Sequence, residues 1–210
     1  PYKPEGHSAE ITKIATNKAI DTVGARAAHF RKEVSQQFKL WPIGAKAAQE
    51  CLAEFLDVQV KYYAEERDLP AKKGTSSLSP YLASGVISPR DVFRQVKALP
   101  VSEGRDVWIS ELVWRDFYRH LMVHFPHVAK GYCFNREYEE MTWAHSEKRL
   151  KAWAEGKTGI PLVDAGIRQL LETGWMHNRV RMVVAMFLTK NLFMSWREGE
   201  RFFMQHLVDG

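Results

Sequence analysis

One predicted helix gathers side chains that suit a binding or catalytic site. An α-helix has about 3.6 residues per turn, so one face of this helix carries Trp108, Glu111, Arg115 and Tyr118. Trp114 lies beside that face. Glu111 and Arg115 are four residues apart, so the simplest expectation is a helical ion pair worth a few tenths of a kcal/mol. Burying such a face costs roughly 1–3 kcal/mol for each polar group left unpaired. The composition therefore favours a face that lines a pocket or a cleft.

A loop ahead of a short predicted helix offers a second candidate site, for an anion. Lys72 and Lys73 precede a run of small and hydroxyl residues, Gly74-Thr75-Ser76-Ser77-Leu78-Ser79-Pro80. The free amides and the dipole at a helix N-terminus attract anions, so a phosphate or a pyrophosphate is a natural ligand. Ordinary helix capping explains the same residues, because Ser and Thr are common caps.

A third candidate follows Gly174. Asn178, Arg181, Met182 and Ala185 align on one face of a predicted helix. An Asn side chain can bind the edge of a base or a flavin, and Arg can pair with a phosphate or a carboxylate. The alternative is a helix start with solvent-facing arginines.

Metal binding is not expected. His120, His124 and His127 have a spacing that can share a metal ion, but no acidic motif completes the set, and histidines on a helix surface explain it better. Cys51 and Cys133 are far apart, so they indicate neither a thiolate metal site nor a disulfide framework.

Composition is typical of a globular protein. The 210 residues carry a net charge of +5, which permits nucleic-acid binding without requiring it. The sequence contains no run of eighteen apolar residues and no signal peptide. We therefore expect a cytoplasmic protein with no membrane partner. We also expect a monomer.

The hydrophobic pattern predicts an all-α, multi-helix domain, since strand alternation is absent. Gly174 is expected to be left-handed at the end of its helix. Ser79 is expected to cap a short helix ending near Gly85, and residues 126–142 to be the least regular interior stretch. The other helices are expected over residues 25–38, 44–66, 88–99, 107–125, 146–155, 161–172, 175–193 and 198–207.

Five ordered segments resemble the photolyase/cryptochrome family, with the greatest likeness to bacterial cyclobutane pyrimidine dimer photolyases. They are GTSSLSPYLASG (74–85), ELVWRDFYRHL (111–121), TGIPLVDA (158–165), TGWMHNRVRM (173–182) and WREGE (196–200). The resemblance implies a helical FAD-binding catalytic domain over residues 41–210, lacking its C-terminal part, after a weakly matched linker over residues 1–40.

The resemblance also implies roles for individual residues. FAD would be contacted by Tyr63, Thr75, Ser76, Ser77, Leu78, Ser79, Trp108, Arg115, Asn178, and by Arg181 paired with Asp209. The flipped pyrimidine dimer and its DNA would be bound by Arg67, Glu111, Trp114, Tyr118, Asn178, Arg179 and Met182. Trp143 and Trp196 match two outer members of the tryptophan chain that photoreduces the flavin.

The implied reaction is light-driven repair of DNA. Excited reduced FAD gives an electron to the dimer, and Glu111 stabilises the charge that develops on it by hydrogen bonding or proton donation. The resemblance also implies that the 210 residues include neither the antenna domain of the family nor the stretch after Gly210 that supplies further flavin contacts in the family. We therefore expect the parent protein to repair DNA and the 210-residue chain alone to bind FAD weakly or not at all.

Two other functions remain open. A cryptochrome-type photoreceptor shares the fold and FAD but signals through a partner. Glu111, Trp114, Asn178 and Met182 together favour repair, because signalling has less need of a dimer pocket. A helical DNA-binding module without catalysis would need no flavin.

Overall fold

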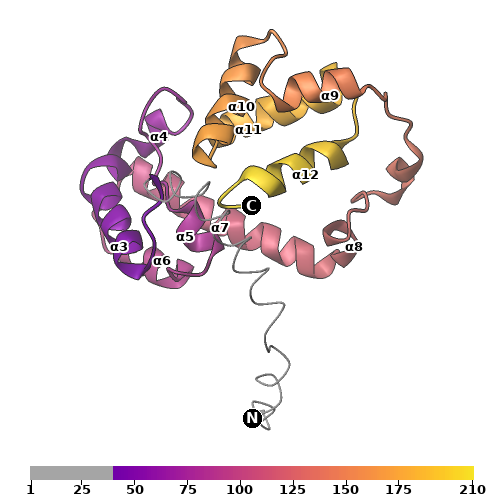
Figure 1. Cartoon of the computed structure of the whole chain (residues 1–210). Coiled ribbons are helices and arrows are strands. Elements are labelled where there is room, and N and C mark those ends of the chain that lie inside the picture. The colour runs from indigo at the N-terminus through magenta and orange to yellow at the C-terminus, as the bar shows by residue number, and fades with distance from the viewer. Residues whose placement is uncertain (1–39) are drawn as a thin grey trace, which may run out of the picture. The chain divides into compact units, whose positions relative to one another are not determined.

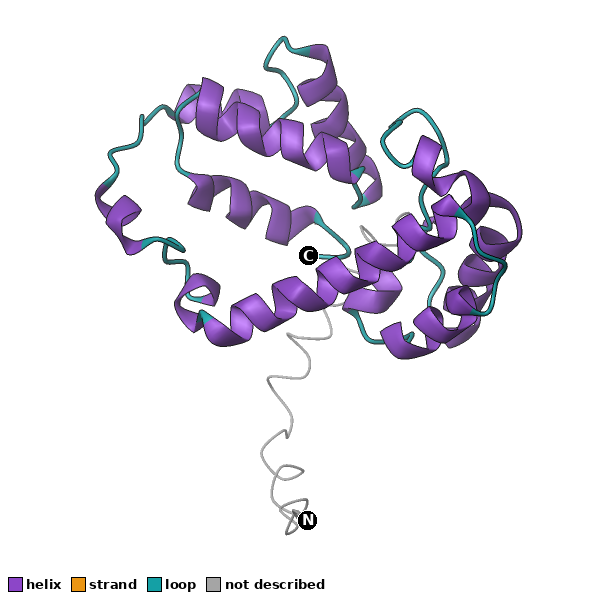
Figure 2. Cartoon of the chain, turned by 180° about the vertical axis from the view of Figure 1, so that it is seen from behind, coloured by secondary structure: helices purple, strands orange, loops and turns teal. Residues whose placement is uncertain are grey.

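The computed structural model describes residues 40–210, and residues 42–210 form one compact unit. Figure 2 shows helices joined by loops, with no strand in the described part of the chain. The predicted all-α class is therefore confirmed. The predicted helix over 25–38, and nearly all of the predicted linker over 1–40, lie outside the described residues.

The described helices divide into an earlier and a later group along the chain. The earlier group and its connecting turns comprise α3 (Ala45–Glu54), η2 (Phe55–Gln59), η3 (Val60–Tyr62), α4 (Tyr63–Glu66), α5 (Ser79–Ala83), α6 (Pro89–Lys97) and α7 (Glu103–His124). The later group comprises α8 (Pro126–Ala129), η4 (Arg136–Glu140), α9 (Glu147–Ala154), α10 (Pro161–Thr173), α11 (Asn178–Met186), η5 (Phe187–Asn191) and α12 (Trp196–His206).

The first hydrophobic core surrounds the N-terminal half of α7. Figure 1 shows α3 to α6 gathered at this end of the long helix. Trp108 and Leu112 of α7 are buried there, and the ring centroid of Trp108 lies 5.3 Å from that of Phe55. Other buried members are Leu52, Tyr63, Leu78, Tyr81, Leu82, Val92 and Val96. Burial of these side chains fixes one face of α7.

The segment predicted as one helix over residues 44–66 is less regular than expected. After α3 the chain passes through a π-helical segment, η2, and a 3-10 turn, η3, before α4. Apolar spacing of three and four residues does not distinguish these turns from α-helix, so the sequence pattern missed them. Gly104 allows α7 to pack closely against η3, because a Cβ at this position would clash with the Val60 carbonyl oxygen.

Several predicted helix ends are also wrong. Ser102 caps α7 by accepting a hydrogen bond from the Arg105 amide at 3.3 Å, so the helix begins before Val107. Ser79 is the first residue of α5 rather than its cap. By contrast, the stretch 126–142, expected to be the least regular in the interior, contains no element longer than the five-residue η4.

The second hydrophobic core lies among α9, α10, α11 and α12, which Figure 1 shows grouped together. Trp153 of α9 is fully buried, and its indole N–H donates to the Val184 carbonyl at 3.1 Å. Gly166 allows α10 and α11 to touch, because a Cβ there would meet the Val180 side chain. These contacts bury the face of α11 that carries Val180 and Val184 in the second core.

The connection between α10 and α11 positions the start of α11. Gly174 has φ 72°, in the left-handed region, as expected. The predicted helix start at Trp175 is wrong, because α11 begins at Asn178. His177 is its cap, and its Nδ1 accepts a hydrogen bond from the Arg179 amide at 3.2 Å. The last turns of the predicted helix form the π-helical segment η5.

None of the helices in the described part of the chain is both long and apolar enough to span a bilayer.

Asp164 fixes the turn that precedes α10. Its buried carboxylate accepts hydrogen bonds from the Thr158 amide at 2.7 Å, the Thr158 hydroxyl at 2.6 Å and the Gly159 amide at 2.9 Å. Burial opposes ionisation, but these hydrogen bonds outweigh it and lower the pKa of Asp164 below its usual value. The ionised form is therefore the one that the fold stabilises.

We expect Asp164→Asn to lower the free energy of unfolding by about 1–3 kcal/mol at neutral pH, because an amide cannot replace a carboxylate that accepts three hydrogen bonds. The contribution exists above the pKa of the unfolded carboxyl and is lost as pH falls through the lower pKa of the folded state. Denaturant unfolding at several pH values measures it. A stability difference that stays constant from neutral to strongly acidic pH would contradict this assignment.

Candidate functional site

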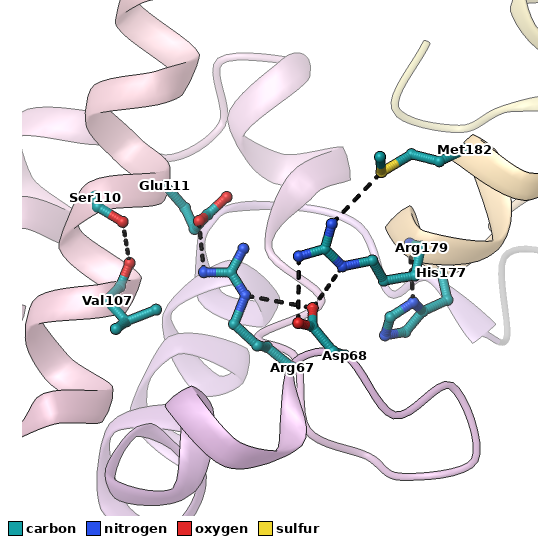
Figure 3. Close-up of polar contacts among 8 residues, drawn as sticks. All are labelled: Arg67, Asp68, Val107, Ser110, Glu111, His177, Arg179 and Met182. Carbon is teal, nitrogen blue, oxygen red and sulfur yellow. Dashed lines mark hydrogen bonds and ion pairs between the residues drawn. The ribbon is translucent and has the colours of Figure 1, made fainter.

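A chain of charged side chains joins α4, α7 and α11, as Figure 3 shows. Arg67, which follows α4, places its Nη1 2.7 Å from Glu111 Oε1 of α7. Asp68 accepts hydrogen bonds from Arg179 of α11, at 2.6 Å from Nε and 3.2 Å from Nη2. The Nε of Arg67 lies 3.6 Å from Asp68 Oδ1. Carboxylates and guanidinium groups therefore alternate along this chain of contacts, which links the earlier group of helices to α11 of the later group.

The partner of Glu111 differs from the expected one. The predicted helical pair with Arg115 is wrong, because Glu111 pairs with Arg67. Arg115 instead donates from Nη2 to the Leu82 carbonyl at 3.0 Å, near the end of α5. The partners of Glu111 and Arg115 therefore come from segments distant in sequence. Residue spacing along one helix does not reveal such partners.

Asp68 and His177 were not identified from the sequence. Asp68 follows Arg67 just after the predicted helix over 44–66, and His177 lies within the predicted helix over 175–193. The hydrogen bond from Arg179 is the main reason that the pKa of Asp68 is lowered. Burial lowers the pKa of His177, because the charged ring is costly to desolvate. Its Nε2 is buried without a hydrogen bond among the described residues.

Aromatic side chains remain exposed on α7 beyond Glu111. Trp114 is 52% exposed and Tyr118 is 59% exposed. Their ring centroids lie 6.1 Å apart, and Phe117 makes edge contacts with both, at 5.6 Å and 5.4 Å. An exposed cluster of three rings on one helix offers stacking surfaces and does not contribute to either core.

Arg115 has unused binding capacity. Its Nη1 is buried and has no hydrogen-bond partner among the described residues. Burial lowers the pKa of the Arg115 guanidinium, with a further contribution from the positive charge of Arg119. A buried guanidinium nitrogen normally has an acceptor, so this atom indicates a polar ligand or a further polar group.

The loop from Gly74 to Ser79 lies against α4 and α3. A Cβ at Gly74 would approach Glu66 to 2.6 Å, so only glycine fits there. Ser77 has φ 52°, a left-handed conformation unusual for serine. The Cys51 thiol donates to the Ser76 carbonyl at 3.2 Å. Within the described residues, the hydroxyls of Thr75 and Ser77 make no hydrogen bond and are half-buried.

Arg181 and Asp209 form a pair, as the family resemblance implies. Arg181 donates from Nη2 to Asp209 Oδ2 at 2.9 Å and from Nε to the Met176 carbonyl at 2.7 Å. The Asp209 side chain is 4% exposed, and its Oδ1 has no hydrogen-bond partner among the described residues. This oxygen is a second buried polar atom with capacity for a ligand.

Trp143 and Trp196 line one hollow of about 670 Å³, together with Tyr132, Tyr138 and Lys190. The guanidinium of Arg197 lies 4.7 Å from the Trp196 ring centroid. The two tryptophans to which the family resemblance gives a role in electron transfer therefore line the same hollow.

The remaining predicted residues occupy different environments. Tyr63 and Trp108 are buried in the first core, and burial raises the pKa of Tyr63 to about 12. Asn178 and Met182 are exposed on α11, and Met182 Sδ lies 3.6 Å from Arg179 Nη1. No group of three metal-binding side chains comes together in the described region.

Comparisons with known proteins identify the family of the chain. The family described as the FAD binding domain of DNA photolyase matches residues 108–210. The deoxyribodipyrimidine photo-lyases of Vibrio cholerae and Escherichia coli are each 46% identical over 174 and 175 residues, covering 81% of this chain. The alignments cover 37% of each relative, so the chain spans about a third of their length.

Solved structures show the same fold. A class III photolyase from Agrobacterium tumefaciens has a TM-score of 0.81 at 44% identity, over 84% of this chain and 37% of that one. A cryptochrome from Synechocystis has a TM-score of 0.74 at 34% identity, over 80% of this chain and 36% of that one. The family match and these sequence and structural likenesses show that the chain belongs to the DNA photolyase and cryptochrome family.

Proposed function

We propose that the protein binds FAD and uses it to split cyclobutane pyrimidine dimers in DNA in the light. The observation that carries this proposal is the Arg67–Glu111 pair beside the exposed rings of Trp114 and Tyr118. An acid held by an arginine next to open stacking surfaces suits a planar, polar substrate. The names of the relatives, which are deoxyribodipyrimidine photo-lyases, support the same substrate class.

The residues present fit FAD in two respects. Arg115 Nη1 and Asp209 Oδ1 are buried polar atoms with free hydrogen-bonding capacity. The loop 74–79 presents half-buried hydroxyls and a glycine that no larger residue can replace. Arg115, Arg181 with Asp209, and the hydroxyls of Thr75 and Ser77 would hold the cofactor, with Ser76, Leu78 and Ser79 completing the loop. Tyr63 and Trp108 would support the site from the core.

FAD, when bound, reduced and excited by light, supplies one electron to the dimer and accepts it back after the ring opens. The chain has to bring the dimer out of the base stack, which costs less than for an intact pair because the lesion weakens pairing and stacking. Arg179 would bind a DNA phosphate, and Trp114 and Tyr118 would stack on the displaced bases. Asn178 and Met182 would contact the dimer or the adenine from α11.

Glu111 would act on the dimer itself. Arg67 holds its Oε1, and its Oε2 makes no hydrogen bond among the described residues. With a proton on this second oxygen, the Glu111 carboxyl group would donate a hydrogen bond to a carbonyl oxygen of the pyrimidine, which stabilises the negative charge that develops there. Trp143 and Trp196 would pass electrons to the flavin when it has to be reduced, and the hollow beside them leaves this end of the pathway open.

A cytoplasmic location and a monomeric state are parts of the same proposal, as is the assignment of residues 41–210 to one FAD-binding catalytic domain. The proposal assigns the activity to the protein that contains this chain.

We expect Arg115→Ala to weaken FAD binding at least about tenfold, because a buried charged hydrogen bond is lost. The flavin absorbance that remains with the protein after removal of free FAD measures it. Arg119→Ala is the matched control, since this exposed arginine lies on the same helix. Equal flavin retention in both variants would contradict the placement of Arg115 at the cofactor.

We expect Glu111→Gln to reduce light-driven dimer splitting several-fold at unchanged flavin content, because the amide stabilises developing charge less well and cannot donate a proton. Dimer loss per absorbed photon measures the effect, with Glu103→Gln as a control in the first turn of the same helix. An unmodified protein that binds FAD but splits no dimers would overturn the repair proposal and favour a photoreceptor. A protein that binds DNA but no flavin would favour a non-catalytic module.

A further inference from the structure

Asp68 is placed to control two arginines at once. Its carboxylate receives a two-point contact from Arg179, through Nε at 2.6 Å and Nη2 at 3.2 Å. The Nε of its neighbour Arg67 lies 3.6 Å away. A planar guanidinium bound through two nitrogens has a fixed orientation, unlike one held through a single nitrogen. Figure 3 shows the carboxylate lying between the two guanidinium groups.

The contact between Asp68 and Arg179 connects parts of the chain that are 111 residues apart. Asp68 follows α4, which packs on the first core through α7, whereas Arg179 lies in the first turn of α11, which packs in the second core. Arg67 continues the connection to Glu111 of α7 at 2.7 Å. Asp68 therefore orients Arg179 and also lies next to Arg67, the residue that pairs with Glu111.

Asp68 itself is a poor candidate for DNA contact or for stability. A carboxylate that is 53% exposed repels phosphates, and exposed ion pairs contribute little to stability. Without the Asp68 carboxylate, Arg179 keeps the Met182 sulfur as a side-chain partner, and Arg67 keeps Glu111 and the face of the Tyr63 ring. The carboxylate therefore matters through the direction in which it holds the two arginines.

We propose that Asp68 is a positioning residue for recognition of the dimer: it orients Arg179 toward a DNA phosphate and steadies Arg67 against Glu111. This inference rests on the proposed function. It implies that Asp68 lowers binding to undamaged DNA, because it neutralises a guanidinium, and raises discrimination in favour of DNA that contains a dimer. If Asp68 only stabilised the fold, its loss would weaken binding to both kinds of DNA. A positioning role and a purely structural role therefore predict different binding results.

The test compares Asp68→Asn with the unmodified protein, both loaded with FAD, in binding to matched duplexes with and without one dimer at fixed salt. We expect affinity for the undamaged duplex to stay equal or to rise, and the preference for the dimer to fall about fivefold or more. Asp91→Asn is the matched control. Asp91 is 51% exposed and pairs with Arg94 on α6, away from this site. It is expected to keep the full preference.

Two further variants separate positioning from folding. Asp68→Glu keeps the charge and should restore most of the preference, even if the amide variant is poorly folded. Arg179→Gln combined with Asp68→Asn should lose less preference than the product of the two single losses, since both changes act on one contact. Multiplicative losses would overturn the claim that Asp68 acts through Arg179.

The outcomes also distinguish the inference from the proposed function. An unmodified protein with no preference for the dimer would overturn the proposed function, and the inference with it. An unmodified protein with a clear preference that Asp68→Asn retains in full would overturn the inference alone. Parallel loss of affinity for both duplexes in Asp68→Asn and in Asp68→Glu would show a structural role and would also overturn it.

Discussion

The ion pairs that connect α4, α7 and α11 are the constraint on which the rest of the site depends. Arg67 and Asp68 are neighbours in the chain, yet they reach Glu111 on one side and Arg179 on the other. The two hydrophobic cores fix the helices, but they do not set the direction of a long charged side chain. Alternating charges do so, because the Arg67 guanidinium lies between the carboxylates of Glu111 and Asp68, and Asp68 accepts two hydrogen bonds from Arg179.

Helix α7 serves the core and the site with different faces. Trp108 and Leu112 are buried among the first group of helices, whereas Trp114 and Tyr118 lie in the open. Glu111 and Arg115 lie at the border between these faces, which explains why each finds a tertiary partner. Because the buried side chains cover only part of the helix circumference, the remaining side chains can contact a ligand without loss of core packing.

Two buried polar atoms support the proposed cofactor site. Arg115 Nη1 and Asp209 Oδ1 are both buried, and a protein interior rarely leaves such atoms unpaired. They come from different groups of helices, one from α7 and one from the segment after α12. A cofactor with several polar groups along its length, such as FAD, is the kind of ligand that satisfies scattered donors and acceptors.

The sequence by itself determined the helical class, the left-handed Gly174 and the residue types of the site, because periodicity, glycine and local spacing are encoded within a few neighbouring residues. The family resemblance, itself a property of the sequence, added the Arg181–Asp209 pair. Only the tertiary structure decided that Glu111 pairs with Arg67, that His177 caps α11, and that Asp68 contacts a residue 111 positions away. These contacts depend on which helices pack side by side, and no spacing along one helix contains that information.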